Sequence, residues 1–159
     1  MSVIGKYLLV FLVSMVPFIE LRGAIPYSQL AGLPLLPSYI VAIIGNMLPV
    51  PIIYFFARKV LVWGADKKYI GKLFTFFLVK GERAGQKLVK ATGRGGLFLA
   101  LLLFVGIPLP GTGAWTGTLG ASFLNMGFKS TVTAVSLGVV SAGIIMALLS
   151  TGVFSIIGL

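Results

Sequence analysis

ELRGAIP, at positions 20–26, interrupts an apolar region of the chain with an acid, an arginine, a glycine and a proline. A charged side chain at the centre of a membrane-spanning helix costs about 2.5 to 3.5 kcal/mol, so Glu20 and Arg22 must pair with another group or face water. Gly23 and Pro26 both disfavour helix, and we expect the helix to break within this stretch. The rest of the fold depends on how the chain enters and leaves this break.

The composition of the 159-residue chain indicates that apolar sequence surrounds this break throughout. Hydrophobic residues make up 58% of the chain and charged residues only 10%, with a mean hydropathy of +1.08. A soluble domain carries roughly 25% charged residues, and a water-soluble core could not bury so much apolar surface. We therefore interpret residues 1–159 as a single membrane domain of a multi-pass protein of the inner or plasma membrane.

The first half of the sequence predicts a short apolar hairpin followed by a full membrane span. The apolar run 7–19 has thirteen residues. This is well short of the roughly 20 that a helix needs to cross, so we expect the run to enter the membrane and return. Residues 38–57 carry no charge and are long enough to span, although Pro49 and Pro51 should kink the helix.

The second half of the sequence repeats this design. The run 97–107 has eleven residues and ends at PLPGTGAW, positions 108–115. An apolar run of this length more often re-enters than spans. Residues 116–128 then return toward Lys129, and the uncharged, proline-free stretch 131–157 is ample for a tilted crossing.

Together these segments predict an all-α integral membrane fold of two re-entrant helical hairpins and two full spans in an inverted repeat. Residues 1–58 form the first repeat and residues 96–159 the second. The basic segment 59–95 joins them, and ten of the thirteen Lys and Arg residues lie between Arg58 and Arg94. The positive-inside rule places this segment in the cytoplasm and both termini on the opposite face. Its apolar residues recur at helical spacing among lysines, which predicts a helix lying on the membrane surface.

The residue types that are missing exclude several classes of function. The chain has no cysteine and no histidine, and its only acids are Glu20, Asp66 and Glu82. The chain therefore lacks thiol nucleophiles and imidazole bases, and it has almost no acids from which to build a multi-carboxylate metal site. We expect no enzyme activity, no metal and no cofactor. Most of the basic residues behind the net charge of +10 lie in one segment. They are not spread over an exposed surface that could contact a nucleic-acid groove, so we expect no nucleic-acid partner.

The first interruption supplies two candidate residues for binding a substrate or an ion. Glu20 could bind and release a proton or a cation, while Arg22 could hold an anionic group, because ionisable residues inside a membrane often mark substrate and ion pathways. The alternative is that both side chains lie at the membrane interface, where Arg22 extends into the headgroups.

The second interruption supplies further candidates, because its prolines and small residues leave main-chain groups free. Such groups are tolerated at membrane depth if they line a wet cavity, and the alternative is a simple loop between two spans. The candidates in this stretch are Pro108, Pro110, Gly111, Thr112, Gly113, Trp115 and Thr116. Asn46, inside the first full span, is the remaining candidate, with a structural interhelical hydrogen bond as its alternative role.

The segments ELRGAIP at 20–26 and PLPGTGAWTG at 108–117 resemble the small multidrug export protein family, and the resemblance covers nearly the whole chain. That family is distantly similar to the DedA membrane proteins, whose two re-entrant hairpins carry an acid and arginines and which are implicated in moving lipid carriers. The resemblance implies matching hairpin tips at Glu20 and at 108–113. The chain departs from the DedA pattern in having Thr112 and Trp115, and no arginine, around the second turn.

We therefore expect a secondary transporter that exports or translocates a small amphipathic or lipid-linked substrate by alternating access around the two tips, coupled to protons through Glu20. The alternative is a non-transporting membrane scaffold or assembly factor, in which the tips are packing devices and the basic segment recruits anionic lipid or a partner. Membrane lipid and the substrate are the expected partners, and the glycine-rich helix faces are compatible with a homo-oligomer.

Overall fold

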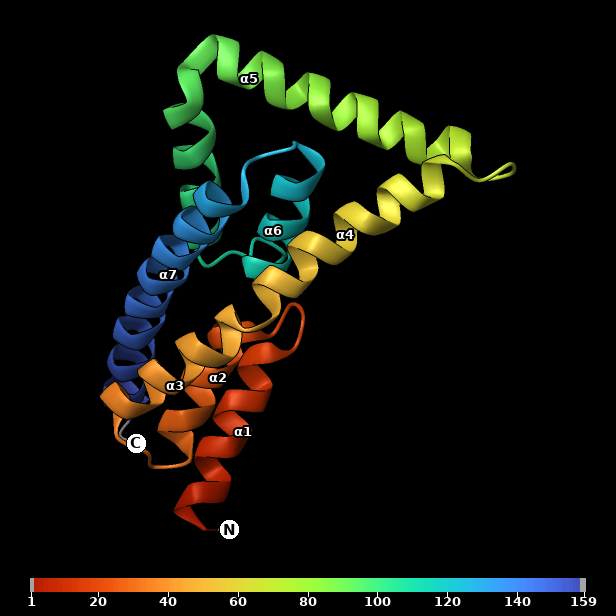
Figure 1. The fold of residues 1–159 in the computed structure, drawn as a ribbon. Helices are drawn as coiled ribbons and strands as arrows, with labels where there is room; N and C mark the ends of the chain where they lie inside the picture. Colours follow the sequence, from red (N-terminus) through yellow and green to blue (C-terminus); the bar gives the residue numbers. More distant parts are fainter. Residues whose placement is uncertain (1, 158–159) are drawn as a thin grey trace.

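The computed structural model describes residues 2–157, which form seven helices and no strand (Figure 1). The helices are α1 (Val3–Met15), α2 (Glu20–Leu30), α3 (Leu35–Met47), α4 (Pro49–Ala65), α5 (Gly71–Gly106), α6 (Ala114–Phe123) and α7 (Phe128–Ile157). Both termini lie at one end of the molecule, and the first part of α5 crosses the opposite end (Figure 1). The all-helical prediction is thus confirmed for these residues.

Three helical segments are long and apolar enough to cross a membrane: Leu35–Ala65, Val89–Gly106 and Phe128–Val153. The first and third contain most of the two spans that the sequence predicted. The first is longer than expected, because helix continues past Arg58 and Lys59 to Ala65. It is divided at Leu48, and Pro49 and Pro51 stand in the first turn of α4, where a missing N–H breaks no helical bond.

The position of the first break differs from the prediction. Helix α1 ends at Met15, before Pro17, and the chain then turns with positive φ at Phe18 and at Glu20. Helix α2 runs through Gly23 and Pro26 without interruption. Leu21, Ala24 and Ile25 are almost completely buried on α2, and this packing outweighs the weak intrinsic helix preference of the stretch.

Helix α5 consists of two parts joined at Gly93, whose φ of 72° and ψ of 176° are not helical. We call residues 71–92 the arm. The arm crosses the end of the molecule, and residues 94–106 turn toward the centre (Figure 1). The prediction that the basic segment is helical is confirmed. The helix bends at Gly93 because a glycine adopts this positive φ without the steric cost that a side chain would add.

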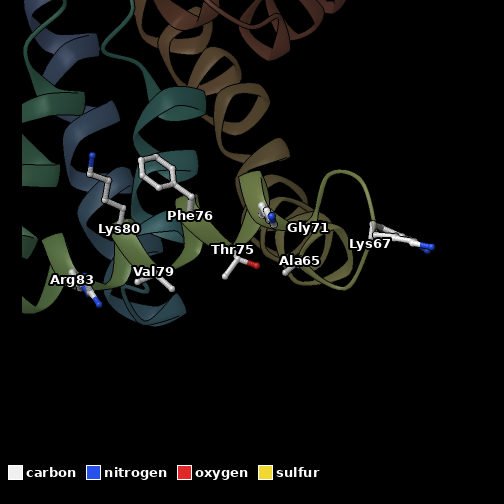
Figure 2. A pocket seen from close by; sticks show the side chains of 10 residues that line it. Ala65, Lys67, Gly71, Thr75, Phe76, Val79, Lys80 and Arg83 are labelled. Carbon is white, nitrogen blue, oxygen red and sulfur yellow. The ribbon is translucent and has the colours of Figure 1, made fainter.

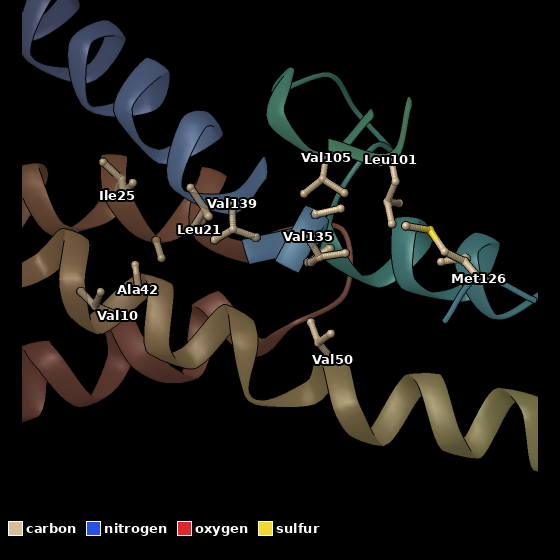
Figure 3. Close-up of a cluster of buried hydrophobic side chains, with 14 of the residues drawn as sticks. Val10, Leu21, Ile25, Ala42, Val50, Leu101, Val105, Met126, Val135 and Val139 are labelled. Carbon is tan, nitrogen blue, oxygen red and sulfur yellow. The ribbon is translucent and has the colours of Figure 1, made fainter. Parts of the chain in front are cut away.

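One apolar core joins the two halves of the chain. Figure 3 shows apolar side chains from α1, α2, α3, α4, α5 and α7 meeting in it. Val10 and Ile25 come from the first half, and Val105 and Val135 from the second, and all four side chains are fully or nearly fully buried. Neither half therefore buries its apolar surface without the other.

Glycines allow close helix contacts at one place in each half of the chain. On α3, a Cβ built at Gly45 would lie 2.6 Å from the carbonyl oxygen of Phe11 on α1. On α7, a Cβ at Gly138 would lie 2.7 Å from Cβ of Val105 and 3.0 Å from the carbonyl oxygen of Leu102 on α5. Each glycine thus lets one helix of the half approach the other at backbone distance.

Gly138→Ala should lower the stability of the protein, because the new methyl group must displace Val105 and part of the α5 backbone. Overpacking of this kind costs about 1 to 3 kcal/mol. Gly152→Ala on the same helix is the matched control, since a Cβ there meets no atom within 4 Å. Thermal unfolding in detergent measures both, and equal unfolding midpoints would contradict the close approach of α5 and α7.

Candidate functional site

The two interruptions meet each other near the centre of the molecule. We call residues 15–22 the first tip, which joins α1 to α2, and residues 107–116 the second tip, which joins α5 to α6. Hydrogen bonds run between the tips in both directions, although the two segments lie more than 80 residues apart in the sequence. The candidate site is this junction.

Glu20 of the first tip binds the beginning of helix α6. Its Oε2 accepts a hydrogen bond from the Ala114 N–H and its Oε1 accepts one from the Trp115 N–H, both at 3.1 Å. The first amides of a helix have no partner within the helix, and the positive end of the helix dipole favours an anion there. Glu20 is only 3% exposed, so these two amides replace water as its hydrogen-bond donors.

Gly113 is required for this contact, because it immediately precedes α6 and faces the same carboxylate. A Cβ built at Gly113 would collide with both carboxylate oxygens of Glu20. The absence of a side chain therefore allows the carboxylate to come close enough to accept from both amides.

Arg22 binds the carbonyl groups of the second tip. Its guanidinium donates to the Leu109 carbonyl, to the Thr112 carbonyl at 2.7 Å and to Thr112 Oγ1 at 3.2 Å. Longer contacts of 3.4 and 3.5 Å reach the carbonyls of Val105 and Ile107 at the end of α5. The last carbonyls of a helix are unpaired and lie at its negative end, which favours a cation.

Trp115 makes the reciprocal contact, from the second tip to the first. Its indole Nε1–H donates to the carbonyl oxygen of Met15 at 3.1 Å. Met15 is the last residue of α1, so its carbonyl belongs to the set that a helix end leaves unpaired. Each tip therefore supplies a side chain that satisfies a helix end of the other.

The second tip is also held by its own side chains. Thr112 Oγ1 lies 2.9 Å from the carbonyl oxygens of both Ile107 and Leu109, and Thr116 Oγ1 donates to the Gly111 carbonyl at 2.7 Å. Gly111 has a φ of 80°, the left-handed region in which glycine is favoured. These bonds fix the turn whose carbonyls face Arg22.

The structure brings part of the predicted set of site residues together. One cluster contains Glu20, Arg22, Thr112, Gly113 and Trp115. The other predicted residues of the second tip shape the turn and make no hydrogen bond to the first tip. These residues are Pro108, Pro110, Gly111 and Thr116.

Asn46 is separate from this cluster. Its side chain on α3 is 1% exposed, and neither its Oδ1 nor its Nδ2 has a hydrogen-bond partner in the described part of the chain. It makes no hydrogen bond to either tip. Asn46 therefore remains a buried polar group whose role the tip contacts do not explain.

Sequence reasoning missed a second junction between α4 and the loop after α6. The Tyr54 hydroxyl donates to the Met126 carbonyl, and the Arg58 guanidinium donates to Asn125 Oδ1. Asn125 has a φ of 56° just beyond α6. An asparagine is a common residue at such a position after a helix, so the sequence did contain a signal for this turn.

Helix α6 lies between two apolar hollows. One, of about 320 Å³, lies between α4 and α6 and is lined by aliphatic and aromatic side chains that include Phe56, Trp115 and Phe123. The other, of about 250 Å³, lies between α5 and α6 beside Phe104 and Gly117. An apolar or amphipathic molecule could therefore lie against α6 close to the tips.

A comparison with protein families places this junction inside a matched region. The model of the family described as "Putative small multi-drug export protein" matches residues 20–145. The match begins at Glu20, contains the whole second tip and ends within α7. No curated protein and no solved structure matches the chain.

Arg22→Lys should destabilise the protein, because an ammonium group cannot form the forked set of hydrogen bonds that the guanidinium makes. Each hydrogen bond to a charged group is worth about 1.5 to 3 kcal/mol, and we expect a loss of that size. Arg94→Lys is the control, since Arg94 is exposed on α5. If thermal unfolding midpoints fall equally for both variants, Arg22 does not hold the second tip.

Proposed function

The chain belongs to the small multi-drug export protein family, and from this premise we propose that it is a secondary transporter in the inner or plasma membrane. Its substrate is a small amphipathic or lipid-linked molecule. The observation that carries the proposal is the junction in which Glu20 and Arg22 of one tip bind the helix ends of the other. Interrupted helices that meet at a binding site are a recurring design of secondary transporters.

The arrangement of helices supports an inverted repeat. Helix α1 packs on α3 as α5 packs on α7, and α2 contacts α7 as α6 contacts α4. Gly45 and Gly138 permit the two corresponding close contacts. The α1/α2 pair approaches the junction from the end with the termini, and the pair formed by α5 and α6 approaches from the end with the arm (Figure 1). These pairs are the two re-entrant hairpins of the proposal.

In this proposal the segment Val89–Gly106 re-enters rather than spans. Lys90 and Arg94 lie in its first turns, and the helix bends at Gly93. The uncharged part that follows is too short to cross a hydrocarbon layer of about 30 Å. The two full spans are then Leu35–Ala65 and Phe128–Val153, and the arm lies on the cytoplasmic surface between the repeats.

The proposed mechanism uses Glu20 as a proton-controlled contact between the tips. The ionised carboxylate accepts hydrogen bonds from two amides at the positive end of α6. Protonation removes the negative charge and turns one oxygen into a donor, which weakens both contacts. The tips separate when the polar part of a substrate also replaces the carbonyl partners of Arg22, and the apolar hollows beside α6 then open to one side of the membrane. Deprotonation re-forms the junction and completes the cycle of alternating access.

The alternative is a membrane scaffold that transports nothing. It is favoured by the extent to which the tip residues already bind one another, since Arg22 and Glu20 use their polar atoms on main-chain groups of the protein itself. A static packing device would need no more than this. Transport measurements distinguish the two proposals.

The topology gives the first test of the proposed function. The chain has no cysteine, so Ser2→Cys and Lys80→Cys can each be labelled without background. We expect an impermeant maleimide to label Ser2→Cys from outside intact cells and Lys80→Cys only after permeabilisation. Labelling of both variants from the same side would refute the arrangement of two hairpins and two spans.

Flux in proteoliposomes tests the mechanism, with a panel of lipid-linked phosphates and organic cations measured with and without a pH gradient. We expect at least one substrate to move at a rate that depends on the gradient. Glu20→Gln should lose this dependence and remain folded, while Glu82→Gln, the same change on the arm, should keep it. If none of the compounds in the panel is transported, the scaffold is favoured. If the flux through Glu20→Gln still depends on the pH gradient, Glu20 has no part in the mechanism.

A further inference from the structure

A cationic pocket of about 620 Å³ lies at the elbow where α4 meets the arm (Figure 2). Its charged lining residues are Lys67, Lys68, Lys72, Lys80 and Arg83, and no acid lines it. We propose that this elbow pocket binds the phosphate headgroup of an anionic phospholipid. The elbow pocket lies on a different surface from the tips, and it would bind lipid whether or not the protein transports a substrate.

The positive charge of the elbow pocket is not neutralised within the protein. The nearby acids Asp66 and Glu82 do not line the pocket, and among residues 2–157 no ion pair engages its five cations. Like charges held together repel one another, and an anion in their midst relieves the repulsion. The pocket therefore has the charge that a phosphate group requires.

Aromatic rings hold two of the ammonium groups in place. Lys67 Nζ lies 4.3 Å from the ring centre of Trp63, and Lys80 Nζ lies 4.7 Å from that of Phe76. Figure 2 shows Phe76 and Lys80 projecting from the same side of the arm, with Lys67 beyond the elbow. These cation–π contacts position the charges while leaving their remaining N–H groups free to donate.

Trp63, the ring that holds Lys67, also indicates that the pocket lies at the level of lipid headgroups. Trp63 is 58% exposed near the end of α4, the helix that completes the segment Leu35–Ala65. Exposed tryptophans at the ends of spans mark the membrane–water interface. The basic residues around it would face the cytoplasmic leaflet by the positive-inside rule, and anionic lipids are concentrated there.

Exposed apolar residues on the arm favour a lipid over a soluble anion. Tyr69, Leu73 and Phe77 are among them, and Phe76 and Val79 line the pocket itself. These side chains suit the glycerol and upper acyl region of a phospholipid, whereas a free phosphate would use only the cations. Surface charges alone are strongly screened by salt, so the apolar contacts are what would retain the ligand.

The bound lipid would brace the elbow. The pocket wall includes Ala65 at the end of α4, residues in the turn that follows it and residues between 71 and 83 of the arm. A headgroup bound at the turn would contact the end of α4 and the start of the arm, and it would stabilise their present angle because its binding energy is lost if the arm swings away. The expected consequence is a protein that is more stable when the anionic lipid is present.

The experiment measures thermal unfolding and lipid retention of the purified full chain in a neutral detergent. Phosphatidylglycerol and phosphatidylcholine with the same acyl chains are titrated, and native mass spectrometry counts the lipids retained. We expect phosphatidylglycerol to bind about tenfold more tightly than phosphatidylcholine and to raise the unfolding midpoint by several degrees. Glycerol 3-phosphate and inorganic phosphate, the soluble forms of the same chemistry, should not reproduce the shift.

A matched pair of triple variants distinguishes lipid binding in the pocket from a non-specific effect of the positive charge on α5. Lys67→Gln, Lys68→Gln and Lys72→Gln together should reduce the lipid preference to about threefold or less. Lys87→Gln, Lys90→Gln and Arg94→Gln remove the same charge from α5 outside the pocket and should leave the preference unchanged. An equal loss in both triple variants, equal binding of the two lipids, or an equal shift with glycerol 3-phosphate would each overturn the proposal.

Discussion

Main-chain polar groups at the two interruptions are the constraint on which the rest of the structure depends. Helix α5 ends and helix α6 begins at the second tip, and α1 ends at the first, so each end leaves N–H or C=O groups without partners in its own helix. In an apolar surrounding every such group costs free energy unless another group binds it. The chain meets this requirement with Glu20, Arg22 and Trp115, each acting on the opposite tip.

The order of charges in the first tip follows from the polarity of the second. The break in the second half presents amides at the positive start of α6 and carbonyls at the negative end of α5. Residues two apart point in different directions from a helix, so Glu20 and Arg22 cannot both face the same group. One reaches the amides and the other the carbonyls. An acid and an arginine separated by one residue thus complement a helix break better than they would complement each other.

The sequence was sufficient for the features that depend on composition. Uncharged runs predicted the two longest apolar segments, and the helical spacing of apolar residues among the lysines predicted the helical arm. It was insufficient where packing or contacts between distant residues determine the local structure. ELRGAIP has weak helix propensity, yet the burial of Leu21 and Ile25 keeps it helical. The turn with positive φ at Phe18 has no residue signal, since phenylalanine rarely adopts that conformation. Apart from Thr112 Oγ1, the partners of Glu20 and Arg22 are main-chain groups, which every residue carries, so no pattern of side chains identifies them.

The same constraint governs how the junction could open under the proposed mechanism. Separating the tips unpairs the amides of Ala114 and Trp115, the carbonyls around Arg22 and the Met15 carbonyl at once. Protonation of Glu20 lowers the cost at the amides but does nothing for Arg22, whose guanidinium stays charged at any physiological pH. Opening therefore requires a polar replacement for the carbonyl partners of Arg22, which the polar part of an amphipathic substrate can supply. A proton alone would weaken the junction without opening it, and this dependence on a second ligand is what couples proton movement to substrate movement in a secondary transporter.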